Sequence, residues 1–289
     1  SAFTRFIGAP WVPPAHFDAH YIAAHRGQWS VELPEVQELL LVAVALTPTG
    51  LADSNLVAHE GRYYQEVMTH FKPFAEQEVV GLIEGALQQN LMLYTVMKED
   101  ANAFRFDGDR LVQDSVYDRL TMDNENIVRP HLSALEAFAK ASGFRAFYAA
   151  HRAYYDSLCT ATREVMPVDA MWRWLEEHTA SHYDNYRITI SPLTEGSHST
   201  VHLDENGFRQ TVMFICPAFS DPSWSPGLTE GQNSRVVFTE IDHNYVNPVS
   251  DLYVDEINKA LADRAKWAAP EITNGYPNAY AVFNEYMTF

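Results

Sequence analysis

The chain has 289 residues, of which 47% are hydrophobic and 13% aromatic, and its 38 acidic and 20 basic side chains give a formal net charge of −18 at pH 7. This composition argues against a disordered chain, and the negative charge argues against nucleic acids and anionic membranes as partners. No apolar run approaches the roughly 20 residues that a membrane-spanning helix needs. The length suits one large domain or two modest ones.

Residues 1–54 are expected to form an N-terminal arm, a strand and a helix. Proline, histidine and aromatic residues over 10–17 indicate an irregular arm. A short strand is predicted at 31–34, and a helix over 35–46 that ends at a Thr-Pro-Thr-Gly turn.

Residues 55–185 are predicted to be mainly helical, because apolar side chains recur there at three- and four-residue steps. The Asp107-Gly108-Asp109-Arg110 run between two short apolar segments indicates one hairpin. The predicted helices are those over 63–74, 81–93, 127–141, 144–165 and 168–179.

Residues 186–289 change in character. Alternation at 187–190 predicts a strand, and Asn206-Gly207 predicts a hairpin turn between two more strands. A buried strand over 235–238 is expected to lead into a helix that carries the functional motif. Ser250 is predicted to cap a helix over 251–266, and a last helix is predicted over 277–289. The predicted fold class is α+β, with a mostly helical N-terminal part followed by a sheet and a motif helix in one continuous unit.

The run Thr239-Glu240-Ile241-Asp242-His243 resembles the His-Glu-x-x-His helix of zinc peptidases with Thr239 in the first His position. In that motif two imidazoles hold the ion, which activates a water molecule, and the glutamate takes the proton. Glu240 and His243 lie three apart and therefore share one face of a helix.

Four interpretations of this run are open. Glu240 is the general base while His243 and a later carboxylate hold the metal, or Glu240 is itself a ligand and Asp242 is the base. A Glu-x-x-His pair is also a known ligand pair for iron or manganese, so a metal site that is not a peptidase site is a further interpretation. Without a metal, Thr239 would cap the start of a helix and His243 would be an ordinary packed histidine.

With its flanks, this segment resembles an uncharacterised bacterial family of predicted metallopeptidases of the gluzincin kind, which carry His-Glu-Phe-Ser-His-type helices followed by a hydrophobic-Val-Asn-Pro tail. The corresponding tail here is Tyr245-Val246-Asn247-Pro248, and the likeness covers about 60–285. The resemblance implies a zincin-like sheet, a zinc cofactor, and Glu285, on a later helix, as the third ligand. The chain departs from the family at Thr239.

Several other residues could support such a site. His198 and His202, four apart near a predicted strand, could replace the missing ligand or stabilise an oxyanion. Tyr245 and Tyr276 could act as oxyanion donors. The two cysteines, Cys159 and Cys216, are interpreted as buried free thiols.

Two functions follow. The first is a gluzincin-like metallohydrolase of the peptidase kind, with Glu240 as the catalytic residue and His243 and Glu285 as metal ligands. The second is an inactive pseudo-peptidase that binds a peptide or protein, which Thr239 favours. The sequence leaves compartment and oligomeric state open, and only weakly indicates an exported bacterial protein.

Overall fold

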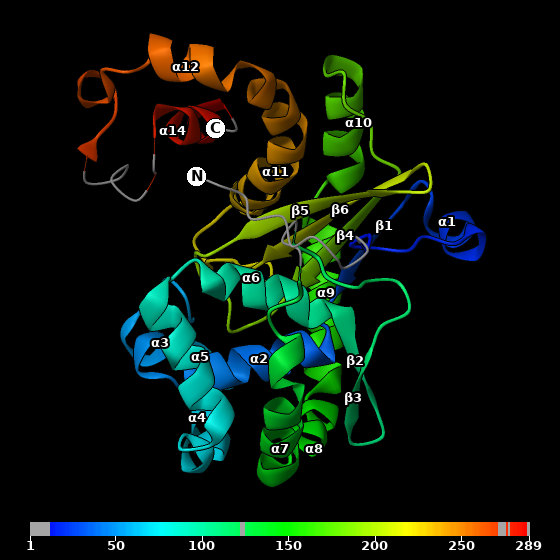
Figure 1. Cartoon of the computed structure of the whole chain (residues 1–289), viewed down its shortest axis with the longest axis vertical. Coiled ribbons are helices and arrows are strands. Elements are labelled where there is room, and N and C mark those ends of the chain that lie inside the picture. The colour runs from blue at the N-terminus through cyan, green and yellow to red at the C-terminus, as the bar shows by residue number, and fades with distance from the viewer. Residues whose placement is uncertain (1–11, 122–124, 271–275, 277, 288–289) are drawn as a thin grey trace. The chain divides into compact units, whose positions relative to one another are not determined.

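The computed structural model describes residues 12–121, 125–270, 276 and 278–287, and it has the predicted α+β fold (Figure 1). The chain divides into two compact units. Unit 1 comprises residues 1–24, 34–151 and 203–208, and unit 2 comprises residues 25–33, 152–202 and 209–289. These units do not coincide with the predicted segments 1–54, 55–185 and 186–289. Residues 1–11 of the predicted arm lie outside the described residues.

Unit 1 is predominantly helical. Its helices and its hairpin are α2 (Glu35–Ala45), α3 (Pro48–Ala52), α4 (Gly61–Phe71), α5 (Glu78–Gln89), α6 (Leu93–Asp100), α7 (Leu132–Ser142), α8 (Phe144–Ala150), β2 (Phe104–Asp107) and β3 (Arg110–Gln113), with 3₁₀ turns at Lys72–Phe74, Ala101–Ala103 and Arg129–His131. Helix α1 (Ala19–His25) ends at the boundary of the unit. Most of the predicted helices and the predicted 104–112 hairpin are confirmed. The predicted turn at 47–50 instead starts α3, whose N-cap is Thr47.

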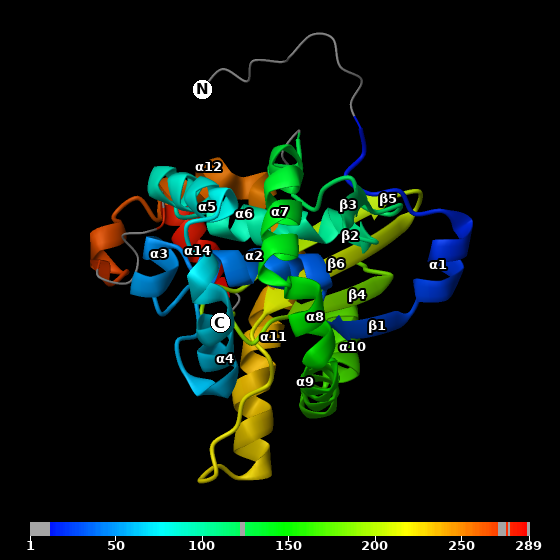
Figure 2. The same ribbon diagram turned by 90° about the horizontal axis from the view of Figure 1, so that it is seen from below.

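Helix α2 is the centre of unit 1. All ten residues from Val36 to Ala45 are buried. Eight of them are apolar, and the two polar ones, Gln37 and Glu38, accept hydrogen bonds from the Asn102 amide and the Tyr63 hydroxyl. Helices α4, α5, α6 and α7 pack around it (Figure 2). Helix α7 ends at Gly143, whose φ of 66° is the left-handed conformation that glycine adopts most easily.

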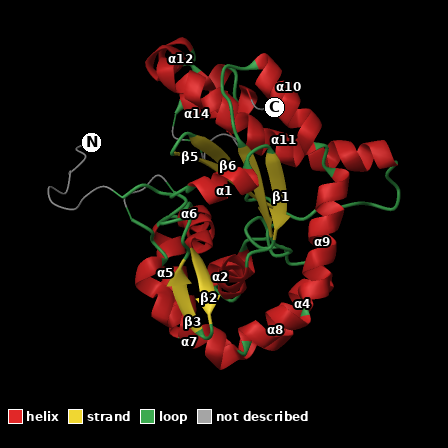
Figure 3. Ribbon diagram, turned by 90° about the vertical axis from the view of Figure 1, so that its right-hand side faces the viewer, coloured by secondary structure: helices red, strands yellow, loops and turns green. Residues whose placement is uncertain are grey.

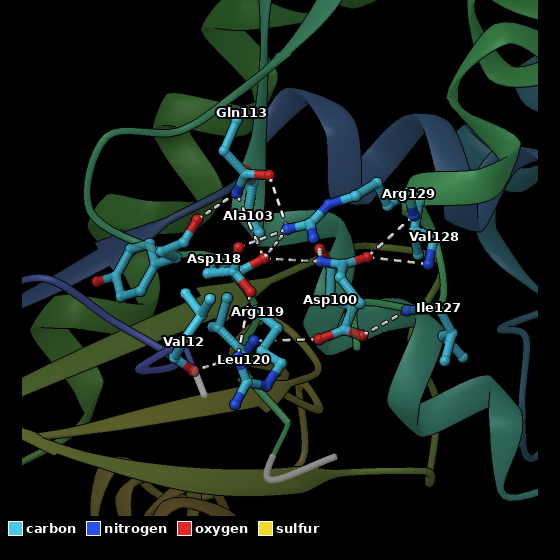
Figure 4. Close-up of polar contacts among 12 residues, drawn as sticks. Val12, Asp100, Ala103, Gln113, Asp118, Arg119, Leu120, Ile127, Val128 and Arg129 are labelled. Atoms are coloured by element: carbon cyan, nitrogen blue, oxygen red, sulfur yellow. Dashed lines mark hydrogen bonds and ion pairs between the residues drawn. The ribbon is translucent and has the colours of Figure 1, made fainter. Parts of the chain in front are cut away.

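Asp100, at the end of α6, fixes the segment that follows the β2–β3 hairpin (Figure 4). One carboxylate oxygen accepts hydrogen bonds from the backbone N–H groups of Leu120 and Thr121, at 3.0 and 3.3 Å, and the other accepts from Ile127 N–H at 3.0 Å. Burial nevertheless raises the pKa of Asp100 above its ordinary value, and these hydrogen bonds only partly oppose the rise. Because backbone donors satisfy both oxygens, we assign Asp100 a structural role.

Unit 2 contains the main sheet and the remaining helices. Its elements are β1 (Gln28–Glu32), α9 (Arg152–Val165), α10 (Val168–His178), β4 (Asn185–Ile190), β5 (Ser199–Glu205), β6 (Phe208–Ile215), α11 (Pro226–Ser250), α12 (Val254–Ala260) and α14 (Ala279–Met287), with 3₁₀ turns at Asp251–Tyr253 and Arg264–Lys266. The sheet has the order β1-β4-β6-β5, and Figure 3 labels its strands β1, β6 and β5. The tip of the β5–β6 hairpin, residues 203–208, groups with unit 1.

The sheet is mixed, and its non-local pairing explains the division of the chain. Strand β1 pairs parallel with β4, with Gln28 opposite Asn185, and β4 pairs parallel with β6. The N-terminal segment therefore supplies an edge strand to the C-terminal unit, which local sequence patterns do not reveal. The predicted hairpin turn is confirmed, since Asn206 and Gly207 have φ values of 54° and 70°, as a type I′ turn requires.

Two predictions near the motif are wrong. Residues 235–238 form no strand and lie inside α11, a helix of 25 residues that starts at Pro226 with Ser225 as its N-cap. The short apolar run 236–238 fits a strand and a buried helix face equally well, and the cap that decides between them lies ten residues upstream. Ser250 is no cap either, because it ends α11 and its hydroxyl donates to the Val246 carbonyl at 2.8 Å.

The C-terminal helices are shorter than predicted. Helix α12 covers 254–260 of the predicted 251–266, and α14 covers 279–287 of the predicted 277–289. Residues 277, 288 and 289 of that prediction lie outside the described residues. Within the described residues, no helix combines the length and the apolar character that crossing a bilayer requires.

Candidate functional site

Helix α11 carries the motif and has two different long faces. Residues 237, 241, 244 and 245 are buried, and two of them contact the sheet. Residues 236, 240, 243 and 247 follow the same three- and four-residue spacing on a neighbouring face, and all four are half-buried. The motif residues are therefore helical, as predicted, but they lie in the second half of a long helix.

Asn244 and Tyr245 attach α11 to the rest of unit 2. The Asn244 side-chain amide donates to the hydroxyl oxygens of Thr200, on β5, at 2.7 Å and of Thr211, on β6, at 2.6 Å. The Tyr245 and Tyr186 hydroxyls lie 2.5 Å apart, and the Tyr245 hydroxyl donates to Glu176 at 2.6 Å. Tyr245, predicted as a possible oxyanion donor, is 1% exposed and occupied by these contacts.

Pro248 creates a gap in the α11 hydrogen-bond ladder that Tyr183 fills. Proline has no N–H, so the carbonyl of Asn244, four residues earlier, loses its helical donor. The Tyr183 hydroxyl donates to that carbonyl at 2.8 Å. The Asn-Pro tail of the motif thus has a structural explanation within unit 2.

Glu176, on α10, is the acceptor at the centre of the sheet-facing network. One of its oxygens accepts from Tyr245, from the Tyr183 backbone N–H and from the Trp172 indole, and the other pairs with His182. Burial would raise the pKa of Glu176, but the hydrogen bonds outweigh it and hold the pKa below its ordinary value. Burial raises the pKa of Tyr245, and the nearby Tyr186 and Glu176 add to the rise. Sequence reasoning missed Glu176, whose partner Tyr245 lies 69 residues away.

The other face of α11 brings together two of the predicted site residues. His243 Nε2 lies 3.8 Å from Glu285 Oε1, which belongs to α14 (Figure 1). The His243 side chain is 17% exposed and that of Glu285 is 44% exposed. The structure therefore brings together two residues that were predicted as metal ligands and that lie 42 positions apart in the chain.

Tyr276 and Glu240 complete this group. The Glu285 carboxylate lies near enough to the Tyr276 hydroxyl to raise the pKa of the phenol. Burial raises the pKa of Tyr276, and the negative charges of Glu285 and Glu240 raise it further, so the phenol keeps its proton at neutral pH. We call Glu240, His243, Tyr276 and Glu285 the α11–α14 site.

Thr239 and Asp242 were predicted as possible site residues, but the structure does not place them in this group. Thr239 is no N-cap, because its hydroxyl bonds within the helix to the carbonyls of Arg235 and Val236, at 3.1 and 3.0 Å. Asp242 lies two residues from Glu240, on the far side of a helical turn, and is 8% exposed. Burial raises its pKa, and the nearby His243 opposes the rise.

His198 and His202 lie in the sheet region. His198 directly precedes β5, and its Nε2 is buried. The His202 ring packs edge-on against Tyr183, with centroids 6.4 Å apart. Tyr183 contacts the sheet-facing side of α11 through Asn244. The structure therefore gives no support to either histidine as a substitute ligand beside His243.

The two cysteines of unit 2 are free, as predicted, and both are half-buried. Burial raises the pKa of Cys159 to about 11 and the pKa of Cys216 to about 11. Since the thiolate is the reactive form, neither has the environment of a nucleophile.

The α11–α14 site fits a metal ion only in part. Within the described residues, no three His, Cys, Asp or Glu side chains are arranged to hold an ion, whereas a catalytic zinc normally has three protein ligands. The two groups that do meet are well spaced, because tetrahedral zinc places a nitrogen and an oxygen ligand about 3.4 Å apart. Their 3.8 Å separation is too long for a direct hydrogen bond.

Comparisons of the chain with models of known protein families, with curated proteins and with solved structures found no match. The functional argument therefore depends on the geometry of these side chains.

Proposed function

We propose that the α11–α14 site binds one divalent transition-metal ion, zinc by preference, and that unit 2 is a gluzincin-like metallohydrolase unit. The observation that supports this most strongly is the approach of His243 and Glu285 from two helices, at nearly the spacing of ligands that share an ion. The motif helix is also bonded to β5 and β6 of the mixed sheet through Asn244, while His243 faces Glu285 of α14.

The residues of the site have separate roles in this proposal. His243 Nε2 and the Glu285 carboxylate hold the ion, and Glu240 acts either as general base or as a third ligand. A bound zinc ion lowers the pKa of a coordinated water molecule to near 7. Tyr276 stays protonated, and its hydroxyl would donate to a developing oxyanion once the neighbouring Glu285 carboxylate has turned to the ion. Peptide bonds are the proposed substrate on the strength of the sequence resemblance.

A second candidate is an inactive relative that retains the scaffold. It is favoured by Thr239, whose hydroxyl is bound to its own helix where the peptidase motif has a ligand. Such a protein would bind a peptide or protein at the same face without turnover.

Elemental analysis of protein purified without chelator or histidine tag separates the two candidates. The metallohydrolase predicts about one zinc per chain, lost in His243→Ala and Glu285→Gln and kept in His178→Ala, an exposed helical histidine on α10. Absence of zinc from the wild type, even after micromolar zinc is added, would overturn the proposal and favour the second candidate.

Two further variants assign the roles. Thr239→His restores the missing imidazole one helical turn before His243 and is expected to tighten zinc binding at least tenfold. Glu240→Gln distinguishes base from ligand: unchanged zinc with lost peptidase activity indicates the base, and lost zinc indicates the ligand. Tighter binding of manganese or iron than zinc would favour the Glu240–His243 ligand pair instead.

A further inference from the structure

Unit 1 contains an apolar cavity that the α11–α14 site does not involve. Its volume is about 430 Å³, and α2, α5, α6, α7 and the segment 127–131 contribute to its wall. The floor is formed by buried side chains, including Leu40, Ile83, Met97 and Leu135. Cavities of this size and character between helices are where small molecules bind.

Two exposed glycines of α5 line the cavity on its solvent side. Gly81 and Gly85 are four residues apart, so they lie one above the other on the same helix face, and both line the cavity. A Cβ atom built at either position meets no atom within 4 Å. At Gly50, by contrast, a Cβ would come within 2.1 Å of the Val44 carbonyl oxygen. Packing therefore requires glycine at position 50, but it does not require it at 81 or 85.

The absence of these two side chains disfavours the helix, because glycine is a poor helix former and α5 is a regular helix of 12 residues. Neither glycine has the left-handed φ that would explain its presence. Because both glycines are exposed, they leave the solvent side of the cavity without side chains at these two positions.

The charge of the lining indicates the kind of ligand. Although the chain has 38 acidic residues, none lines the cavity among the residues described, and His131 is its one titratable group. Gln89 adds a neutral polar group. Since apolar walls would hold an apolar body, the polar end of a ligand would meet an imidazole and an amide.

We propose that unit 1 binds a single-chain amphiphile in this cavity, with an aliphatic tail over the floor and a neutral or anionic head beside His131 and Gln89. A cationic head would find no carboxylate partner in the lining. This site is independent of metal binding in unit 2.

Calorimetric titration of the full chain with dodecanoate, below its micelle concentration, tests the proposal. We expect saturable one-to-one binding, weakened at least tenfold by Gly85→Leu, because the leucine side chain would occupy the cavity. Gly231→Leu is the matched control: Gly231 lies in α11, a Cβ there also meets nothing within 4 Å, and binding should be unchanged. Circular dichroism and thermal unfolding confirm that each variant is folded.

Two further ligands test the predicted preference for a neutral or anionic head. Dodecanol should bind within a few-fold of dodecanoate, and dodecyltrimethylammonium should bind at least tenfold more weakly. Absence of saturable binding to the wild type, equal affinity in a folded Gly81→Leu/Gly85→Leu double variant, or equal affinity for the cationic amphiphile would overturn the proposal.

Discussion

The two faces of α11 contrast within one helix. On the sheet-facing side, Asn244 and Tyr245 are 3% and 1% exposed, and their polar groups bond to other parts of unit 2. On the face toward α14, His243 and Glu285 meet at 3.8 Å without a direct hydrogen bond, and both remain accessible to solvent.

We interpret this difference as a division between polar groups that stabilise the fold and polar groups that bind the proposed ligand. A buried polar group whose hydrogen bonds are all made within the protein contributes to stability and specificity, and has no donor or acceptor left for a ligand. Polar groups of opposite charge that face each other at an exposed site contribute little to stability and can accept a ligand. The predictions that follow test this division, beginning with the largest effect.

Replacing Asn244 should destabilise unit 2 strongly. Asn244→Ala removes two hydrogen bonds of 2.7 and 2.6 Å and leaves the Thr200 and Thr211 hydroxyls without that donor. We expect the free energy of unfolding to fall by about 3 kcal/mol. Urea unfolding measures the loss. A loss of less than about 1 kcal/mol, with an unchanged dependence of the unfolding free energy on urea concentration, would contradict a structural role for this face.

The hydroxyl of Tyr183 should be coupled to Pro248. Tyr183→Phe leaves the Asn244 carbonyl without its donor and should cost about 1–2 kcal/mol. In a Pro248→Ala background, the new backbone N–H can donate to the same carbonyl, so the cost of Tyr183→Phe should fall. A double-mutant cycle by chemical denaturation measures the coupling. Additive losses would show that the hydroxyl does not replace the missing helical bond.

Much of the fold was predictable because its signals are local. The helical periodicity of unit 1 and the Asn206-Gly207 turn each lie within a few residues, and these elements were predicted. The pairing of β1 with β4 joins Gln28 to Asn185, and no short pattern encodes it. The predicted strand at 235–238 was wrong because the cap that decides the matter, Ser225, lies outside the apolar run.

The candidate site was predictable to a similar extent. The sequence placed Glu240 and His243 on one helix face through their spacing, and the resemblance supplied Glu285. The sequence could not show that Tyr245 is bonded to Glu176, since that contact spans 69 residues. It also could not show that Thr239 bonds to its own helix, because a threonine within a helix and one at its start differ only in backbone conformation.

The pH dependence of stability should reflect the network around Glu176. Burial opposes ionisation of this carboxyl, but hydrogen bonds from Tyr245 and Tyr183 and the pairing with His182 leave its pKa below the ordinary value. A depressed folded-state pKa adds stability that is present above the unfolded pKa and is lost as pH falls through the folded pKa. Unfolding measured from pH 7 down to pH 3 should therefore show a smaller acid loss in Glu176→Gln than in wild type. Parallel curves would indicate that Glu176 titrates alike in the folded and unfolded states.

The smallest expected effects are on the face toward α14. His243→Ala and Glu285→Gln should each lower the stability of the metal-free protein by less than about 1 kcal/mol, because the two side chains lie 3.8 Å apart without a direct hydrogen bond and Glu285 is 44% exposed. Added zinc should raise the stability of the wild type by about 2.7 kcal/mol at 100 times its dissociation constant, and should not raise that of either variant. Thermal unfolding with and without zinc makes both comparisons. If the metal-free Glu285→Gln protein loses as much stability as Asn244→Ala, the pair is structural, since side chains whose role is to hold an ion contribute little to stability in its absence.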